Sequence, residues 1–542
     1  MKKILKTALA LCLVLLVLLS AVSCRKPTED TPNPGDGTHV HAFETVTEEK
    51  APTCVADGKK AATCSCGIMK VTTLLATGKH NYQNKVCTVC GRKDATGLTS
   101  PVLCGDALSS YVIVYAEGAS DYTVRAAEYI AKEIKARTGI TLSVSTIGAT
   151  SDANAHEIVV GETSRPISQT LNADTKGLEF AILANEDHIA IEGDYFVIAA
   201  AAYYFVETYI PEAVFDIDVP QTVSVATPIV KEAKNFILLI GDGMGHNQTK
   251  LFDAYKGEQI ADYSDGEDFF YGYLFPYIGE VRTDSLSGTT DSAAAGTALA
   301  SGYKTENGTI GRDKDQNDVP LLTELAAQQG KATAVMSTEK QTGATPSAFS
   351  AHAYHRSNTT AISKAQAELT AQYGTIINCG YDVYTEEKMQ NLRHAITDTL
   401  QTLSKDEDGF FLMYEEAYID KHCSALNVEK AYLATVRFNQ TIALFMEYAF
   451  YNPETMVIVT ADHETGGLHL DENGEFQFVS EEHTSANVPV FAYGARAEIF
   501  NGKTIENVQI AKTIAAMFGV KIEGTEPENY PSLMPLLQLE TK

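Results

Sequence analysis

Apolar, β-branched runs alternate with segments of helical periodicity from Lys234 to the C-terminus. The runs at 236–240, 410–414 and 456–460 have the length and composition of buried strands. Strands that alternate with helices along a chain are typical of a parallel sheet covered by helices. We therefore predict the α/β fold class for this region, with a central, mostly parallel sheet and helices on both of its faces.

A second pattern, at 100–226, predicts a small α+β accessory module. We expect an amphipathic helix at 122–136 and an apolar helix at 197–209. The expected strands are 111–115, 142–144, 158–160, 180–183 and 189–191. The phrases at 157–165 and 189–193 resemble the small non-catalytic α/β domain that precedes the barrels of glycosidases such as hexosaminidases. No barrel follows here, so we interpret the module as a packing unit, with a cell-surface polysaccharide as the alternative partner.

The first residues have the pattern of an export signal. Lys2, Lys3 and Lys6 precede an apolar stretch at 8–19, which is short for a membrane-spanning helix, and small residues follow it. The residues before Cys24 resemble a bacterial lipoprotein cleavage box, although Ala21 stands where leucine is usual. We predict a signal peptide at 1–23, lipidation of Cys24, and a solvated linker at 24–38. The protein would then be membrane-anchored outside the cytoplasm, at the cell surface or in the periplasm.

The next segment, 39–94, holds half of the ten cysteines of the chain. Two short cysteine pairs look like the knuckles of a zinc-ribbon-like repeat, and the first pair is one residue short of normal zinc spacing. An exported chain meets oxidising surroundings, so disulfide bonds are an equally good interpretation. The cysteines that would bind structural zinc or form disulfides are Cys54, Cys64, Cys66, Cys87 and Cys90.

The length and the net charge of the chain limit the number of domains and the class of partner. A chain of 542 residues is too long for one hydrophobic core, so several domains are expected. The formal net charge of -28 repels polyanions, which argues against nucleic acid as a partner. An anionic substrate would need a local patch of metal ions or arginine.

Polar residues follow the apolar runs at the expected strand ends. Asp242, Glu415 and the pair Asp462 and His463 each come just after one of these runs or at its end. In open α/β sheets ligands bind beyond the carboxyl ends of the strands, so we expect these side chains to converge. Crowded carboxylates repel one another, and bound cations would remove that conflict. Oxygen and imidazole ligands suit zinc and magnesium.

Ser292 is the candidate nucleophile. Asp291 has the character of a helix cap, so a helix is expected to begin at Ser292 and to present the hydroxyl beside free backbone N–H groups. An Asp-Ser-Ala segment taken alone is no more than a good helix start. A serine needs activation, which a neighbouring metal ion supplies by favouring the alkoxide.

The residues from about Asn235 onward resemble the alkaline phosphatase family, in the family's order, which assigns 232–542 as the catalytic domain. The resemblance implies an alkaline phosphatase-like sheet, a serine that becomes phosphorylated, two zinc sites and one magnesium site. Catalysis is implied for Ser292 and Arg356. Phosphate binding is implied for Asp291, Arg356 and Lys421. Metal binding is implied for Asp242, Thr345, Glu415, Asp420, Asp462, His463 and His483.

Two departures from the family pattern bear on these metal sites. The family has histidine four residues after the aspartate that matches Asp420, and here Ser424 stands there, which is a poor zinc ligand. His422 and Cys423 are the alternative ligands, and Cys423 points more nearly in the right direction on a helix. We expect a weakened or rearranged second zinc site. Gly343 stands where the family has Asp or His near magnesium, which we expect to tune the affinity for that ion.

The expected function is hydrolysis of small phosphate monoesters through a phosphoserine intermediate, outside the cytoplasm. A degenerate surface protein that binds metal or phosphate without turnover is one alternative, and Ser424 supports it. A hydrolase of phosphodiesters or sulfate esters with the same fold is another. Family members are commonly dimers, so a homodimer is a further expectation from the resemblance.

Overall fold

The chain forms two compact units, Met1–Asp94 and Ala95–Lys542. The computed structural model describes 45–51, 58–63, 69–74, 81–83, 86–87, 101–147, 156–171, 177–185, 188–210, 216–217, 219, 224–255, 269–381, 385–525 and 533. The expected signal segment and Cys24 lie outside the described residues, as do Cys54, Cys64, Cys66 and Cys90. Within the described part of the chain, no helix has both the length and the apolar character required to cross a bilayer.

The described residues of the first unit form two small antiparallel sheets. Strands β1 (Thr45–Lys50), β2 (Gly58–Thr63) and β3 (Met69–Leu74) pair in sequence order. Strands β4 (Tyr82–Gln83) and β5 (Val86–Cys87) form a hairpin. Because most of the cysteines of this segment lie outside the described residues, the zinc-ribbon interpretation stays a prediction.

The second unit begins with a mixed six-stranded sheet in the order β14-β11-β12-β10-β8-β9. The strands are β8 (Tyr111–Tyr115), β9 (Val144–Thr146), β10 (His156–Val160), β11 (Phe180–Ala184), β12 (His188–Glu192) and β14 (Ser224–Ala226). Helices α2 (Asp121–Thr138) and α4 (Val197–Tyr209) pack against each other, and both contact the sheet. Both expected helices and four of the five expected strands are confirmed in place. The fifth, β9, begins at Val144, where expectation had it end.

Short elements complete this part of the unit. They are β6 (Val102–Leu103), β7 (Asp106–Ala107), the 3-10 turn η1 (Leu108–Ser110), α3 (Pro166–Leu171) and β13 (Asp216–Ile217).

The main sheet has eight strands in the order β18-β17-β19-β15-β20-β25-β16-β26. Its strands are β15 (Asn235–Gly241), β16 (Tyr277–Arg282), β17 (Ala332–Ser337), β18 (Ile376–Cys379), β19 (Phe410–Glu416), β20 (Thr455–Thr460), β25 (Val488–Tyr493) and β26 (Thr504–Glu506). All pairings are parallel except the two that β25 makes with its neighbours. The predicted α/β class with a mostly parallel sheet is confirmed.

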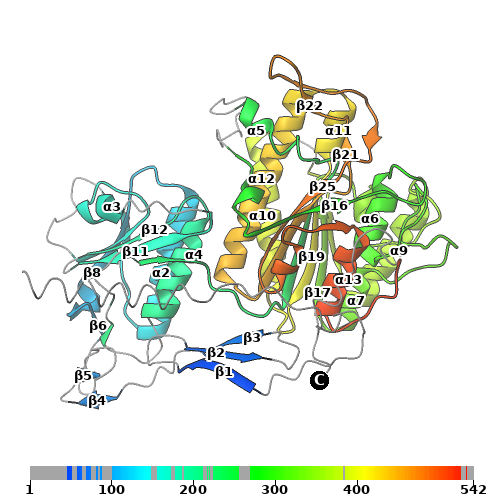
Figure 1. Cartoon of the computed structure of the whole chain (residues 1–542). Helices are drawn as coiled ribbons and strands as arrows, with labels where there is room; N and C mark the ends of the chain where they lie inside the picture. The colour runs from blue at the N-terminus through cyan, green and yellow to red at the C-terminus, as the bar shows by residue number, and fades with distance from the viewer. Residues whose placement is uncertain are drawn as a thin grey trace, which may run out of the picture. The chain divides into compact units, whose positions relative to one another are not determined.

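Helices cover both faces of this sheet (Figure 1). α10 (Glu386–Leu403) and α12 (Val428–Tyr451) lie on one face, and α7 (Leu322–Gln328) and α13 (Val508–Met517) on the other. The remaining helical elements are α5 (Leu251–Ala254), η2 (Tyr271–Leu274), α6 (Ser292–Ser301), α8 (Ala344–Ala348), α9 (Thr359–Tyr373), α11 (Tyr418–Ser424) and η3 (Ala497–Phe500). Near the site, β21 (Glu464–Thr465) pairs with β24 (His483–Thr484), and β22 (His469–Leu470) pairs with β23 (Phe476–Gln477).

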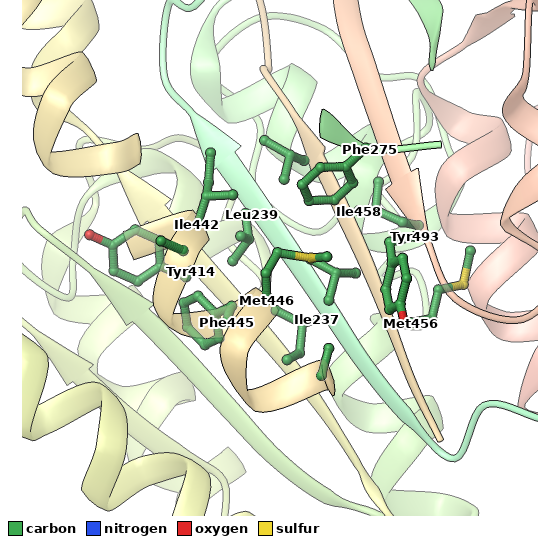
Figure 2. Packing of buried hydrophobic residues seen from close by; sticks show 14 of the residues in the cluster. Ile237, Leu239, Phe275, Tyr414, Ile442, Phe445, Met446, Met456, Ile458 and Tyr493 are labelled. Atoms are coloured by element: carbon green, nitrogen blue, oxygen red, sulfur yellow. The ribbon is translucent and has the colours of Figure 1, made fainter. Parts of the chain in front are cut away.

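The core follows from the alternation of side chains along the strands. Ile237 and Leu239 of β15 point to one face, where Figure 2 shows them beside Phe445 and Met446 of α12. Phe236 points to the opposite face and its ring contacts Phe518, with ring centroids 4.9 Å apart. Because the central strands are buried on both faces, their apolar runs are nearly continuous. This core holds the carboxyl ends of β17, β19, β15 and β20 at one edge of the sheet.

Candidate active site

Three neighbouring parallel strands, β19, β15 and β20, carry acidic groups to one edge of the sheet. Asp242 follows β15, Glu415 is the last residue but one of β19, and Asp462 comes two residues after β20. All three side chains are buried. The three strand ends lie side by side in the sheet.

Ser292 is brought to the same edge by helix α6. The helix begins at Ser292, and the side chain of Asp291 accepts a hydrogen bond from the backbone N–H of Ala294 at 3.0 Å. This is the cap predicted from the sequence. The Oγ atom of Ser292 lies 3.2 Å from Nε2 of His463, and both residues are buried.

His463 stands between the serine and two carboxylates. Its Nε2 lies 3.5 Å from Oδ1 of Asp242 and 3.4 Å from Oδ2 of Asp462. Burial lowers the pKa of His463, which favours the neutral form that can bind a metal ion. Its Nδ1 faces the hydroxyl of Thr465 at 3.2 Å rather than a carboxylate, so this is not a Ser-His-Asp triad.

Two overlapping groups of three side chains have the spacing of metal ligands. Asp242, Asp462 and His463 form one group, and Asp420, His463 and His483 form the other; within each group the ligand atoms lie within 4.8 Å of one another. The rings of His463 and His483 stack with centroids 3.6 Å apart. Mixed carboxylate and imidazole ligands suit zinc.

Buried oxygens without partners support the metal interpretation. Among the described residues, Oδ1 of Asp242, Oδ2 of Asp462, Oε1 of Glu415 and Oγ1 of Thr345 are buried and make no hydrogen bond of acceptable geometry. A buried oxygen without a hydrogen bond is costly, and cations bound at the two ends of this cluster would offset that cost. Burial, and then repulsion from Asp462, raises the pKa of Asp242 well above its usual value; burial and then repulsion from Glu339 does the same for Glu415. The carboxylate, hydroxyl and imidazole groups gathered here could hold divalent cations.

Asp420 and His483 shift each other's pKa in opposite directions. Nε2 of His483 lies 3.4 Å from Oδ1 of Asp420. Burial alone would lower the pKa of His483, but the hydrogen bond to Asp420 raises it to about 9. Burial alone would raise the pKa of Asp420, but the hydrogen bond from His483 lowers it to about 2. Without a metal ion the two side chains are held together as an ion pair, and a cation that bound both would displace the proton of His483.

Gly243 allows α11 to approach this edge. It has a φ of +76°, and a Cβ there would lie 2.8 Å from both Cα and Cβ of Asp420. Glycine is needed for the backbone conformation and for the space. The turn after β15 can therefore bring Asp242 and Asp420 into one site.

The alternative ligands proposed beside Ser424 lie elsewhere. Cys423 is buried, and its Sγ lies 3.9 Å from Nε2 of Gln248. His422 packs against the ring of Tyr418, and burial lowers its pKa to about 4. Among the described residues, neither belongs to a group with metal-ligand spacing. The group that lies nearest to the expected second site contains Asp420, His463 and His483 instead.

Two cationic side chains complete the site. Nη1 of Arg356 donates to Oδ2 of Asp291 at 3.1 Å, and the arginine side chain remains 39% exposed. Nζ of Lys421 donates to Oε2 of Glu339 at 2.8 Å. Arg356 is therefore anchored beside Ser292 while part of its guanidinium faces solvent.

Glu339 was missed from the sequence. It lies two residues after β17, whose neighbour in the sheet is β19. The strand-end rule that identified Asp242 would have found it, but the run at 332–337 is interrupted by polar residues and was not recognised as a strand.

One protein-family model matches the region that carries this site. The alkaline phosphatase family model matches residues 233–383 and 377–479. The C-terminal part of the chain is an alkaline phosphatase family domain. The expected resemblance is confirmed for this part of the chain.

Curated relatives are similar to the alkaline phosphatase domain at modest identity. Alkaline phosphatase 3 of Bacillus subtilis is 26% identical over 334 residues, which covers 52% of this chain and 71% of the relative. Alkaline phosphatase of Escherichia coli is 25% identical over 412 residues, covering 54% of this chain and 87% of the relative. Among solved structures, alkaline phosphatase from the Antarctic bacterium TAB5 is 28% identical, covers 53% of this chain and 99% of that one, and has a TM-score of 0.47.

Proposed function

We propose that the alkaline phosphatase domain hydrolyses phosphate monoesters, with Ser292 as the nucleophile and phosphoserine as the intermediate. The observation that carries the proposal is the position of the Ser292 hydroxyl. It lies at the start of a helix, 3.2 Å from the imidazole of His463, a residue that belongs to both candidate metal-ligand groups. A serine there is adjacent to the cations that would activate it.

The ligand groups divide by chemistry. We propose zinc at Asp242, Asp462 and His463 and a second zinc at Asp420 and His483, because imidazole and carboxylate suit that ion. We propose magnesium at Asp242, Thr345 and Glu415, whose ligand atoms are all oxygens. When bound, such ions supply Lewis-acid stabilisation of the charge that develops on phosphate oxygens.

The chain's own residues position the phosphate. The backbone N–H groups at the start of α6 favour an anion next to Ser292. Arg356, held by Asp291, offers its remaining donors to two phosphate oxygens in the bidentate geometry that guanidinium prefers. This local positive charge overcomes the repulsion expected from a net charge of -28.

We further propose that this chemistry takes place outside the cytoplasm, on a chain anchored through Cys24. The proposal rests on the export pattern of the first residues and on the cleavage-box resemblance. Labelling with a radioactive fatty acid in a bacterial host tests it, with Cys24→Ser as the control. Incorporation into both proteins or into neither would contradict the proposal.

The test of function is hydrolysis of a chromogenic phosphate monoester by the full chain with added zinc and magnesium. We expect turnover by the parent and a loss of at least about a thousandfold in Ser292→Ala, since removal of a nucleophile disables the whole catalytic unit. Acid quenching should trap phosphate on Ser292, detected by mass spectrometry. Faster turnover of a phosphodiester or sulfate ester than of the monoester would contradict the substrate assignment.

Ser424 separates the catalytic proposal from its main alternative, a degenerate metal-binding protein. Ser424→His restores an imidazole one helical turn after Asp420, and we expect tighter zinc binding and about 10- to 100-fold higher activity at limiting zinc. Ser424→Ala is the matched control and should behave like the parent. A parent that is inert with every metal, with activity only in Ser424→His, would support the degenerate alternative.

A further inference from the structure

Gly343 leaves a space at the start of α8, and another residue fills it. A Cβ on Gly343 would lie 1.7 Å from Oε1 and 2.1 Å from Cδ of Glu339. The φ of Gly343 is -61°, which any residue adopts, so glycine is not required by the backbone. With Glu339 in its observed conformation, a side chain at 343 would overlap the Glu339 carboxylate, so one of the two would have to move away.

Glu339 connects the lysine of the site to the oxygen-rich ligand group. Its Oε2 accepts the hydrogen bond from Nζ of Lys421 at 2.8 Å, and its side chain is 14% exposed. Its backbone N–H donates to Oγ of Ser337 at 3.0 Å, and that hydroxyl donates to Oε2 of Glu415.

Independent observations point to a cation beside this carboxylate. Oγ1 of Thr345 and Oε1 of Glu415 are fully buried and have no hydrogen-bond partner of acceptable geometry among the described residues. Thr345 lies two residues after Gly343, and the carboxylate of Glu339 fills the space beside Gly343. Mg²⁺ keeps several waters when it binds proteins, and carboxylates just outside its direct ligands hold those waters.

We propose that Glu339 is a positioning residue that takes the place of the side chain absent at Gly343. Its carboxylate supports a divalent cation at the Asp242, Thr345 and Glu415 group, and it holds Lys421 at the phosphate side of the site. This inference rests on the proposed function for the identity of the substrate, but its cation-binding part does not depend on turnover.

A four-protein cycle tests the exchange of carboxylates: the parent, Glu339→Ala, Gly343→Asp and the double variant, each as the full chain loaded with zinc. The readout is the affinity for Mg²⁺, measured by calorimetric titration. We expect each single change to weaken binding by about 10- to 100-fold, the usual cost of losing a residue that supports a metal ligand. In Gly343→Asp the cause is overlap with Glu339.

The double variant decides the proposal. With Glu339 removed, the carboxylate of Gly343→Asp enters the vacated space, so we expect Mg²⁺ affinity to return to within about tenfold of the parent. Gly343→Asp would then weaken Mg²⁺ binding in the parent but strengthen it in Glu339→Ala. An ion pair that only orders a loop is not expected to reverse the effect of a substitution in this way. If the two changes add, or if neither single change alters the affinity, the proposal is wrong.

Controls keep this result separate from folding and from the proposed function. Glu368→Ala removes an exposed carboxylate on α9, paired with Lys364 at 3.6 Å, and should leave Mg²⁺ affinity unchanged. If Glu339→Ala does not fold, Glu339→Gln keeps the shape and should show the same loss of affinity. An inert parent with the expected cycle would contradict only the proposed function, whereas an active parent with additive changes would contradict only the role of Glu339.

Discussion

Asp291 joins the start of helix α6 to the arginine of the site. Its carboxylate accepts hydrogen bonds from the backbone N–H of Ala294 and of Gly308, each at 3.0 Å, and from Arg356 at 3.1 Å. Burial alone would raise the pKa of Asp291, but these three donors lower it below its usual value. One side chain therefore serves both the geometry of the helix and the orientation of a guanidinium.

The two contributions of Asp291 can be separated by substitution. We expect Asp291→Ala to lower the free energy of unfolding by about 1 kcal/mol, because the cap is lost, and to weaken inhibition by inorganic phosphate, because Arg356 loses its anchor. Asp291→Asn keeps a capping oxygen without the charge, so it should retain most of the stability and still bind phosphate more weakly. Urea unfolding and phosphate inhibition measure these effects. Equal destabilisation by both variants would contradict the capping role.

At the scale of elements, a buried ion pair ties α12 to the end of β19. The guanidinium of Arg437 donates from Nε to Oε2 of Glu416 at 2.6 Å and from Nη2 to Oε1 at 2.5 Å, and both side chains are almost fully buried. The backbone N–H of Tyr418 donates to the same carboxylate at 3.0 Å. Because Glu416 follows Glu415 directly, this pair supports the strand end at which the metal ligands meet.

Breaking this pair from one side should be costly. We expect Arg437→Met to lower the free energy of unfolding by about 3 to 5 kcal/mol, since it leaves the Glu416 carboxylate buried and uncompensated. The double variant Arg437→Met with Glu416→Gln removes that charge and should recover part of the loss. Denaturant titration of the full chain measures both. A double variant less stable than Arg437→Met would show that the buried charge is not the cause.

At the scale of the whole molecule, the accessory module shares the long helix of the alkaline phosphatase domain. Nε and Nη2 of Arg125 on α2 donate to the two carboxylate oxygens of Glu447 on α12, each at 2.8 Å. Tyr129 contacts Tyr451, with ring centroids 4.4 Å apart, and α4 packs along α12. One helix thus has the main sheet on one side and the module on the other.

Because the module and the main sheet both pack on α12, removal of the module should lower the thermal stability of the rest of the chain. A chain that starts at Ala95 keeps the whole compact unit and should match the thermal stability of the full chain. A chain that starts at Thr227 exposes the apolar surface of α12 that faced the module, so we expect a lower melting temperature and stronger binding of a hydrophobic dye. Calorimetry and dye fluorescence measure the difference. If the shorter fragment is as stable as the longer one, the module is an appended domain and not part of the packing.

The sequence alone determined those features that depend on near neighbours. The helix α4 at Val197–Tyr209 and the start of α6 at Ser292 were predicted at their observed positions, since apolar periodicity and capping are properties of adjacent residues. The strand ends that carry Asp242 and Glu415 were located for the same reason. Strand β9 was misplaced because its pairing partner, Ile113–Tyr115, decides which residues enter the sheet.

Only the tertiary structure decided which of these residues meet. The order of the eight strands, with β25 reversed, brings Ser292 to His463 and closes the Asp420–His483 pair across distant parts of the chain. The carboxylate of Glu339 lies in the space beside Gly343, and Arg437 is buried against Glu416. Such contacts follow from how long loops close and how faces pack, which no local pattern of residues specifies.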